Sequence, residues 1–172
     1  PGWTIVDVTN PADPKVVNFI AGPDNTWTLQ MDIAGDTMVT ALERKPPVWG
    51  GDPKRPNDEG VLIWDLKNPL SPARLGQFHT GGTGTHRNAY QGGRYVHLAA
   101  GMPGNEGNIY VILDISDPAR PVEAGRWWIP GQHVAGGEKR SPGTVGRPSL
   151  HGPVAVEGNL AFLPYGSGGM IT

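Results

Sequence analysis

A short motif occurs three times in the chain, and this repeat limits the possible folds more than any other feature. Each copy begins with an apolar run that ends in Asp. After two intervening residues comes Asn-Pro or Asp-Pro, followed by two further residues, a second Pro and another run. The copies lie at 4–14, 62–72 and 111–121, and a fourth begins near residue 169. Asp at such a turn accepts hydrogen bonds from the backbone N–H groups that follow, so we expect Asp7, Asp65 and Asp114 to cap turns.

Two short strands around a tight turn lie between successive copies, in residues 26–42, 85–99 and 150–164. Each turn contains glycine, which supplies the positive φ that a tight hairpin needs. One unit is therefore four strands, and four-stranded units that repeat at about 50 residues are typical of β-propeller blades. The sequence predicts an all-β fold, a β-propeller of four-stranded antiparallel blades.

The strings TIVDVTNP at 4–11 and VILDISDP at 111–118 resemble the LVIVD repeat of bacterial β-propeller proteins, and residues 150–163 are similar to its inner hairpin. The resemblance implies a propeller and a secreted, periplasmic or cell-surface location. It implies little about activity, because propellers host many functions.

The repeat divides residues 1–172 into parts of a single propeller segment. We expect a partial blade at 1–20, complete blades at 26–78 and 85–128, and a partial blade at 150–172. These amount to about three blades, whereas closed propellers have about four to eight. The remaining blades are therefore expected in missing sequence or in another chain.

Composition excludes several classes of protein. Gly and Pro contribute 26 and 18 residues, which approaches the range of disordered chains, but six Trp, four Tyr and three Phe argue for a packed core. The net charge of −2 and the scattered basic residues give no footprint for nucleic acid. No apolar stretch is long enough to span a membrane. The chain has no Cys, which excludes disulfides, thiolate metal sites and Cys nucleophiles.

The long connections all fall on one face of the predicted propeller. Alternating strand directions place the connections at 21–25, 44–59, 79–84, 101–107 and 129–149 together, whereas the opposite face has only tight turns. Long loops on a rigid scaffold are where binding usually occurs, so this face is the predicted functional face.

Two histidines begin inner strands on that face. His86 and His151 each precede a hairpin glycine by seven residues, and neighbouring blades would bring them together near the channel. Converging imidazoles suit Zn, Fe, Cu or Mn. The alternative is that each histidine caps its strand by a hydrogen bond to the next blade.

The strand at 85–90 is polar where an apolar inner strand is expected. Alternation would direct His86, Asn88 and Tyr90 one way and Arg87 the other, and the equivalent stretch with Gln30 is also polar. A wet channel that binds a polar or anionic ligand would explain both stretches. Bridging between blades is the alternative.

Two tryptophans complete the predicted site, since Trp49 lies in a long connection and Trp128 beside another. His79 and His133 are expected to be solvated and His97 to pack in its strand. Two functions remain. The first is a small-molecule site at His86 and His151 that would hold a metal and support oxidoreductase or hydrolytic chemistry. The second is a non-catalytic module that binds protein or glycan.

Overall fold

The computed structural model describes residues 1–140 and 146–172 and consists of β-strands joined by turns and three short 3-10 helices. The strands are β1 (Gly2–Asp7), β2 (Lys15–Ala21), β3 (Thr26–Ala34), β4 (Thr37–Arg44), β5 (Gly60–Asp65), β6 (Ala73–Phe78), β7 (Gly84–Ala89), β8 (Tyr95–Gly101), β9 (Asn108–Asp114), β10 (Val122–Trp127), β11 (Ala155–Glu157), β12 (Leu160–Pro164) and β13 (Met170–Ile171). The 3-10 helices are η1 (Pro47–Trp49), η2 (Val134–Gly136) and η3 (Gly166–Gly168). No helix among the described residues is long and apolar enough to cross a membrane.

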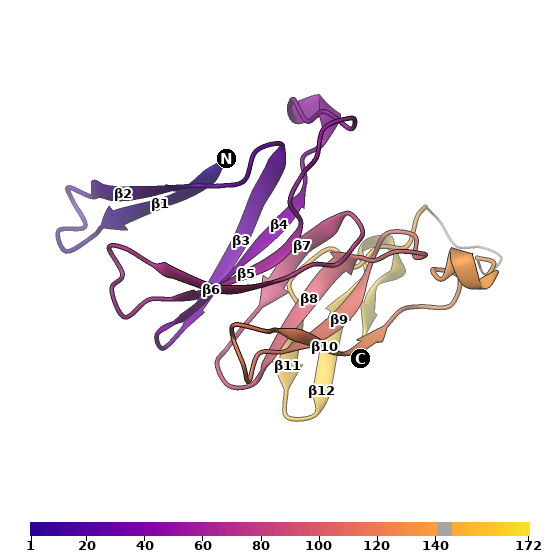
Figure 1. Ribbon diagram of the computed structural model, residues 1–172. Coiled ribbons are helices and arrows are strands. Elements are labelled where there is room, and N and C mark those ends of the chain that lie inside the picture. The colour runs from indigo at the N-terminus through magenta and orange to yellow at the C-terminus, as the bar shows by residue number, and fades with distance from the viewer. Residues whose placement is uncertain (141–145) are drawn as a thin grey trace.

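Antiparallel pairing groups the strands into blades (Figure 1). Strands β3 to β6 pair in chain order, and so do β7 to β10. β1 and β2 form a separate two-stranded sheet, and β11, β12 and β13 form a separate three-stranded sheet. The predicted fold class is confirmed: the chain is a partial β-propeller of four-stranded blades. The assignment of all 172 residues to one propeller segment stays a prediction.

The repeated aspartates cap the turns between the third and fourth strands of each unit. One carboxylate oxygen of Asp7, Asp65 and Asp114 accepts a hydrogen bond from the backbone N–H two residues later, at 2.8, 2.8 and 2.9 Å. The next Asn or Asp does the same two residues further on. Two consecutive side-chain caps fold the chain back sharply, and the predicted structural role of these aspartates is confirmed.

A bulge recurs in the fourth strand of each unit. Relative to its partner strand, the fourth strand has one extra residue at Val17, Leu75 and Ala124. These positions are separated by the same intervals as the repeated aspartates. A bulge increases the local right-handed twist, so each unit bends at an equivalent place.

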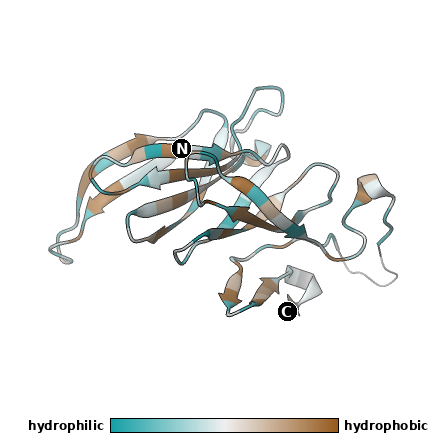
Figure 2. Ribbon diagram, turned by 60° about the horizontal axis from the view of Figure 1, so that its bottom comes forward, coloured by the Kyte–Doolittle hydropathy of each residue, from teal (hydrophilic) through white to brown (hydrophobic). Residues whose placement is uncertain are grey.

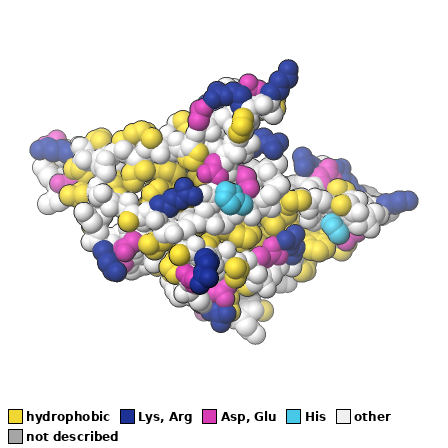
Figure 3. Space-filling view, viewed as in Figure 1, with side chains coloured by type: hydrophobic (Ala, Val, Ile, Leu, Met, Phe, Trp, Pro, Cys, Tyr) yellow, Lys and Arg dark blue, Asp and Glu magenta, His cyan; other side chains and the backbone are white. Residues whose placement is uncertain are grey.

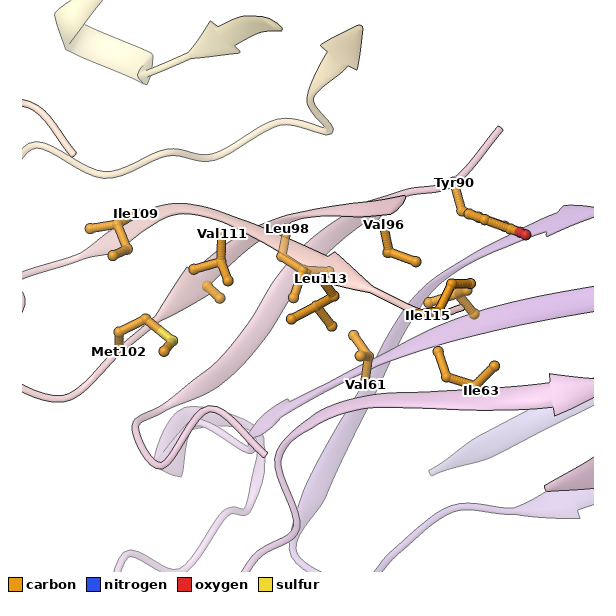
Figure 4. Packing of buried hydrophobic residues seen from close by; sticks show 12 residues of the cluster. Val61, Ile63, Tyr90, Val96, Leu98, Met102, Ile109, Val111, Leu113 and Ile115 are labelled. Atoms are coloured by element: carbon orange, nitrogen blue, oxygen red, sulfur yellow. The ribbon is translucent and has the colours of Figure 1, made fainter. Parts of the chain in front are cut away.

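Three hydrophobic clusters fill the spaces between successive units. The largest joins β4 and β5 to β8 and β9, and Figure 4 shows Val61 and Ile63 facing side chains such as Leu98 and Leu113. A second cluster, around Trp3 and Trp64, joins β1–β2 to the next blade, and a third joins β8–β9 to β11–β12. Figure 2 shows the hydrophobic residues concentrated in the strands and the hydrophilic residues in the connections. Packing between blades therefore supplies the core.

The described part of the chain forms an open arc. Within residues 1–140 and 146–172, no strand pairing joins β1–β2 to the β11–β13 sheet. Apolar side chains are exposed on β2, where Val16 and Phe19 are 69% and 57% exposed. Hydrophobic side chains are also visible over this end of the molecule in Figure 3.

Candidate functional site

A cavity of about 670 Å³ opens on the face that carries the long connections. Its walls come from both complete blades and from the segment before β11. Trp27 of β3, Glu43 of β4 and His86 of β7 line it together with His151. The connection between β10 and β11 also contributes, although residues 141–145 of it lie outside the described residues.

His86 occupies a bulge in the inner strand of the second blade. Thr85 pairs with Ala100 and Arg87 with Ala99, so His86 is the extra residue between them. A bulge redirects the side chain of the inserted residue. The alternation of side chains between the two faces of the strand is therefore interrupted at this position. The His86 ring lines the cavity, whereas Asn88 and Tyr90 are buried elsewhere.

A carboxylate from the neighbouring blade holds the His86 ring. Nδ1 of His86 lies 2.9 Å from Oε2 of Glu43, and the two side chains are only 14% and 15% exposed. A carboxylate accepts hydrogen bonds, so Nδ1 is the donor in this contact, and in the neutral ring Nε2 is left with the lone pair. Nε2 is buried and has no partner among the described residues.

Gly84 makes this contact between blades possible. Gly84 has φ +104°, and a Cβ there would lie 2.4 Å from the carbonyl oxygen of Leu42. Only glycine lets β7 approach β4 this closely. The resulting pair, Glu43 with Gly84, joins the two blades and places His86 beside Glu43.

Four aromatic rings form a row, of which Trp27, His86 and His151 line the cavity and Trp49 packs against Trp27 outside it. The centroids of Trp49 and Trp27 are 4.2 Å apart, those of Trp27 and His86 are 5.8 Å apart, and those of His86 and His151 are 5.0 Å apart. The row brings together His86, His151 and Trp49, which were predicted from three separate parts of the sequence.

Buried amide side chains anchor the two long connections. Nδ2 of Asn25 donates to three carbonyl oxygens of the 45–59 connection, and Oδ1 accepts from the N–H of Asp52 at 2.8 Å. Gln132 donates to the carbonyl oxygens of Glu106, Asn108 and Pro148. Figure 3 shows basic and acidic side chains on the outer part of the loop that carries η1.

His151 lies outside the strand that was expected to contain it, because β11 begins only at Ala155. Pro153 has no N–H to donate to a neighbouring strand, which shortens the strand. The N–H of His151 still donates to the carbonyl of Pro164 at 3.1 Å, so the histidine stays beside the end of β12.

Three predicted polar residues lie beside the cavity or deeper in the inner strands. The Arg87 guanidinium donates to the carbonyl oxygen of His86 at 2.8 Å. Asn88 donates to Asp32 at 2.6 Å, and Gln30 also hydrogen-bonds Asp32. Burial raises the pKa of Asp32, and these hydrogen bonds oppose the shift. Asn88 of β7 and Asp32 of β3 thus form a polar bridge between inner strands, and Gln30 hydrogen-bonds Asp32 within β3.

The structure places the other two predicted residues in packing positions. Tyr90 is 8% exposed and belongs to the largest hydrophobic cluster, and its hydroxyl donates to the Gly93 carbonyl at 3.2 Å. Trp128 packs on the edge of that cluster, and its indole N–H donates to Glu138. Neither residue lines the cavity.

The remaining histidines lie away from the His86–His151 pair. His79 is near Asp58 and Glu59, at 3.7 and 3.6 Å. His133 packs against Trp128. His97 is half-buried in β8 and hydrogen-bonds the Tyr110 hydroxyl at 2.8 Å.

Sequence reasoning missed Trp27, Glu43 and Asn105, which all line the cavity. Glu43 had a weak signal, since it is a charged residue directly after the buried run Met38–Leu42. Nδ2 of Asn105 is buried and has no acceptor among the described residues. No three His, Asp or Glu side chains within 1–140 and 146–172 converge so as to hold a metal ion by themselves.

Comparison with known families supports the repeat. The model of the LVIVD repeat matches residues 2–20 and 104–128, which contain the β1–β2 and β9–β10 units. No curated protein matches the chain. The unit at β5–β6 lies outside the matched residues but has the same capped turn and the same bulge. Two of the repeat units thus match the LVIVD repeat, which is consistent with an LVIVD-repeat family protein.

Proposed function

We propose that this propeller binds a small ligand in the cavity on its long-loop face, through His86 and His151. The observation that carries the proposal is the state of His86: Nδ1 is bound to Glu43, whereas Nε2 is buried without a partner. A buried polar atom without a partner costs about 1–3 kcal/mol. A ligand that bonds to Nε2 would remove this cost.

A transition metal ion is the occupant that the two imidazoles fit best. Histidines that bind metals usually donate the other ring N–H to a carboxylate, as His86 does to Glu43. Two imidazoles on one Zn²⁺, with Zn–N bonds of about 2.0 Å, have ring centroids about 5 Å apart. The His86 and His151 centroids are 5.0 Å apart.

The two histidines would leave other coordination positions for further ligands. Additional inner strands of a larger propeller could supply some of them, and water or substrate could occupy the rest. The oxidoreductase or hydrolytic chemistry suggested by the sequence would require such an open position. A secreted, periplasmic or cell-surface location remains part of the proposal.

Calorimetric titration with ZnCl₂ tests the proposal. We expect the protein to bind Zn²⁺ with an affinity that falls at least about tenfold in His86→Ala and in His151→Ala, because each variant removes one ligand. Glu43→Gln should weaken binding by about 10- to 100-fold, because it removes the charge that orients the ring. His79→Ala, on the same face, is the matched control and should bind like the native protein. Equal zinc affinity in all four variants would refute the metal site.

The non-catalytic alternative has one observation in its favour. At the tip of the 45–59 connection, Val48 is 82% exposed and Trp49 is 53% exposed, and exposed tryptophan is a common binding anchor. If the protein is a glycan-binding module, Trp49→Ala should reduce binding on a glycan array, whereas His86→Ala should leave that binding unchanged.

A further inference from the structure

We infer that the cavity recognises an organic anion, a carboxylate or a phosphate ester, attached to a flat apolar body. The inference rests on the proposed function because it takes the same cavity as the binding site. It concerns the charge and shape of the molecule that enters, which the histidine pair does not determine.

The cavity has an excess of positive charge. Three basic side chains line it, namely Arg44, Lys45 and Arg147, and Glu43 is the single carboxylate among its lining residues. Glu43 is already hydrogen-bonded to His86. A cavity whose lining carries a net positive charge attracts anionic ligands.

The basic side chains are only partly neutralised by their surroundings. Arg147 lies 3.5 Å from Glu106, but Glu106 is shared with Arg140. Nε of Arg44 donates to the neutral side chain of Asn57 at 3.3 Å. Within residues 1–140 and 146–172, neither Arg44 nor Lys45 forms an ion pair. Guanidinium groups bind carboxylates and phosphates well because two parallel N–H groups match two oxygens.

The remaining walls favour an apolar, planar body. Trp27 lines the cavity beside the apolar residues Pro46 and Met102. Trp49 and His86 both pack against the Trp27 indole, with ring centroids 4.2 and 5.8 Å away, so its position is fixed before a ligand arrives. The Asn105 amide nitrogen adds a donor for an oxygen of the ligand.

Three aromatic probes separate charge from shape: the anions benzoate and phenyl phosphate, and benzamide, which is the neutral isostere of benzoate. Calorimetry on EDTA-treated protein should show binding of at least one of the two anions, and binding of benzamide at least about tenfold weaker. The anion bound more tightly identifies the head group. Raising the salt concentration should weaken anion binding, because screening reduces the attraction.

Charge-removing variants locate the interaction. Lys45→Ala and Arg147→Ala should each weaken anion binding by about tenfold, the effect of losing one charge-assisted contact. Lys54→Ala removes an exposed charge from the same connection without touching the cavity and should bind normally. Equal binding of benzamide, absence of binding by both anions, or unchanged binding in Lys45→Ala and Arg147→Ala would each overturn the inference.

Zinc titration of Lys45→Ala and Arg147→Ala separates this inference from the proposed function. Both imidazoles are intact in these variants, so zinc binding should persist within about twofold while anion binding falls. Anion binding without zinc binding in the native protein would overturn the metal site alone. Zinc binding without anion binding would overturn the anion inference alone.

Discussion

His97 lies in β8 away from the cavity, and burial lowers the pKa of its imidazole from the ordinary value of 6.5. The folded protein therefore takes up this proton less readily than the unfolded chain. Stability is lost as the pH falls through 6.5, since the unfolded chain then binds more protons. In His97→Gln the group no longer titrates, while an amide can still hydrogen-bond the Tyr110 hydroxyl. We expect a smaller decrease in the free energy of unfolding between pH 7 and pH 5.

Urea unfolding at several pH values measures this effect. A His97→Gln variant with the same pH dependence as the native protein would contradict the assignment.

Individual residues of the site were predictable only where the repeat or the loops marked them. Counting from hairpin glycines identified His86 and His151, which do meet. Alternation failed after Thr85, because the bulge at His86 shifts the side-chain pattern, and Tyr90 belongs to the core. The role of Glu43 depends on a contact between blades, which no local pattern reveals.

At the scale of elements, the 45–59 connection depends on Asn25. Asn25 has φ +50°, so Asn25→Gly tolerates this backbone conformation and removes the side-chain hydrogen bonds. We expect a loss of about 1–3 kcal/mol in stability. The released loop should also be cleaved faster by trypsin after Lys54.

Limited proteolysis followed by mass spectrometry measures that cleavage. Asn159→Gly, in the exposed turn between β11 and β12, is a matched control and should be cleaved at Lys54 at the native rate. Unchanged cleavage in Asn25→Gly would show that other contacts hold the connection.

Strands and turns were the most predictable elements, because their determinants are local. The capped turns follow from Asp and Asn with the Pro residues beside them. The late start of β11 and the recurring bulges were not predicted. The late start of β11 depends on Pro153, which has no N–H to donate. The bulges depend on which residues pair across the two strands.

At the scale of the whole molecule, the repeat predicted a partial propeller because each unit buries its apolar faces against its neighbours. The three clusters between units show this packing. The cavity was predictable as a location, from the asymmetry of the loops. Its basic lining and the contact through Gly84 arise only when the two blades meet.

The central claim is that His86 and His151, from separate units, form one ligand site. Anomalous diffraction from crystals grown with a zinc salt tests it most directly. We predict a zinc peak at about 2.0–2.1 Å from Nε2 of His86 and from a ring nitrogen of His151. Zinc bound only elsewhere, or Nε2 of His86 hydrogen-bonded to another residue of the protein, would contradict the claim.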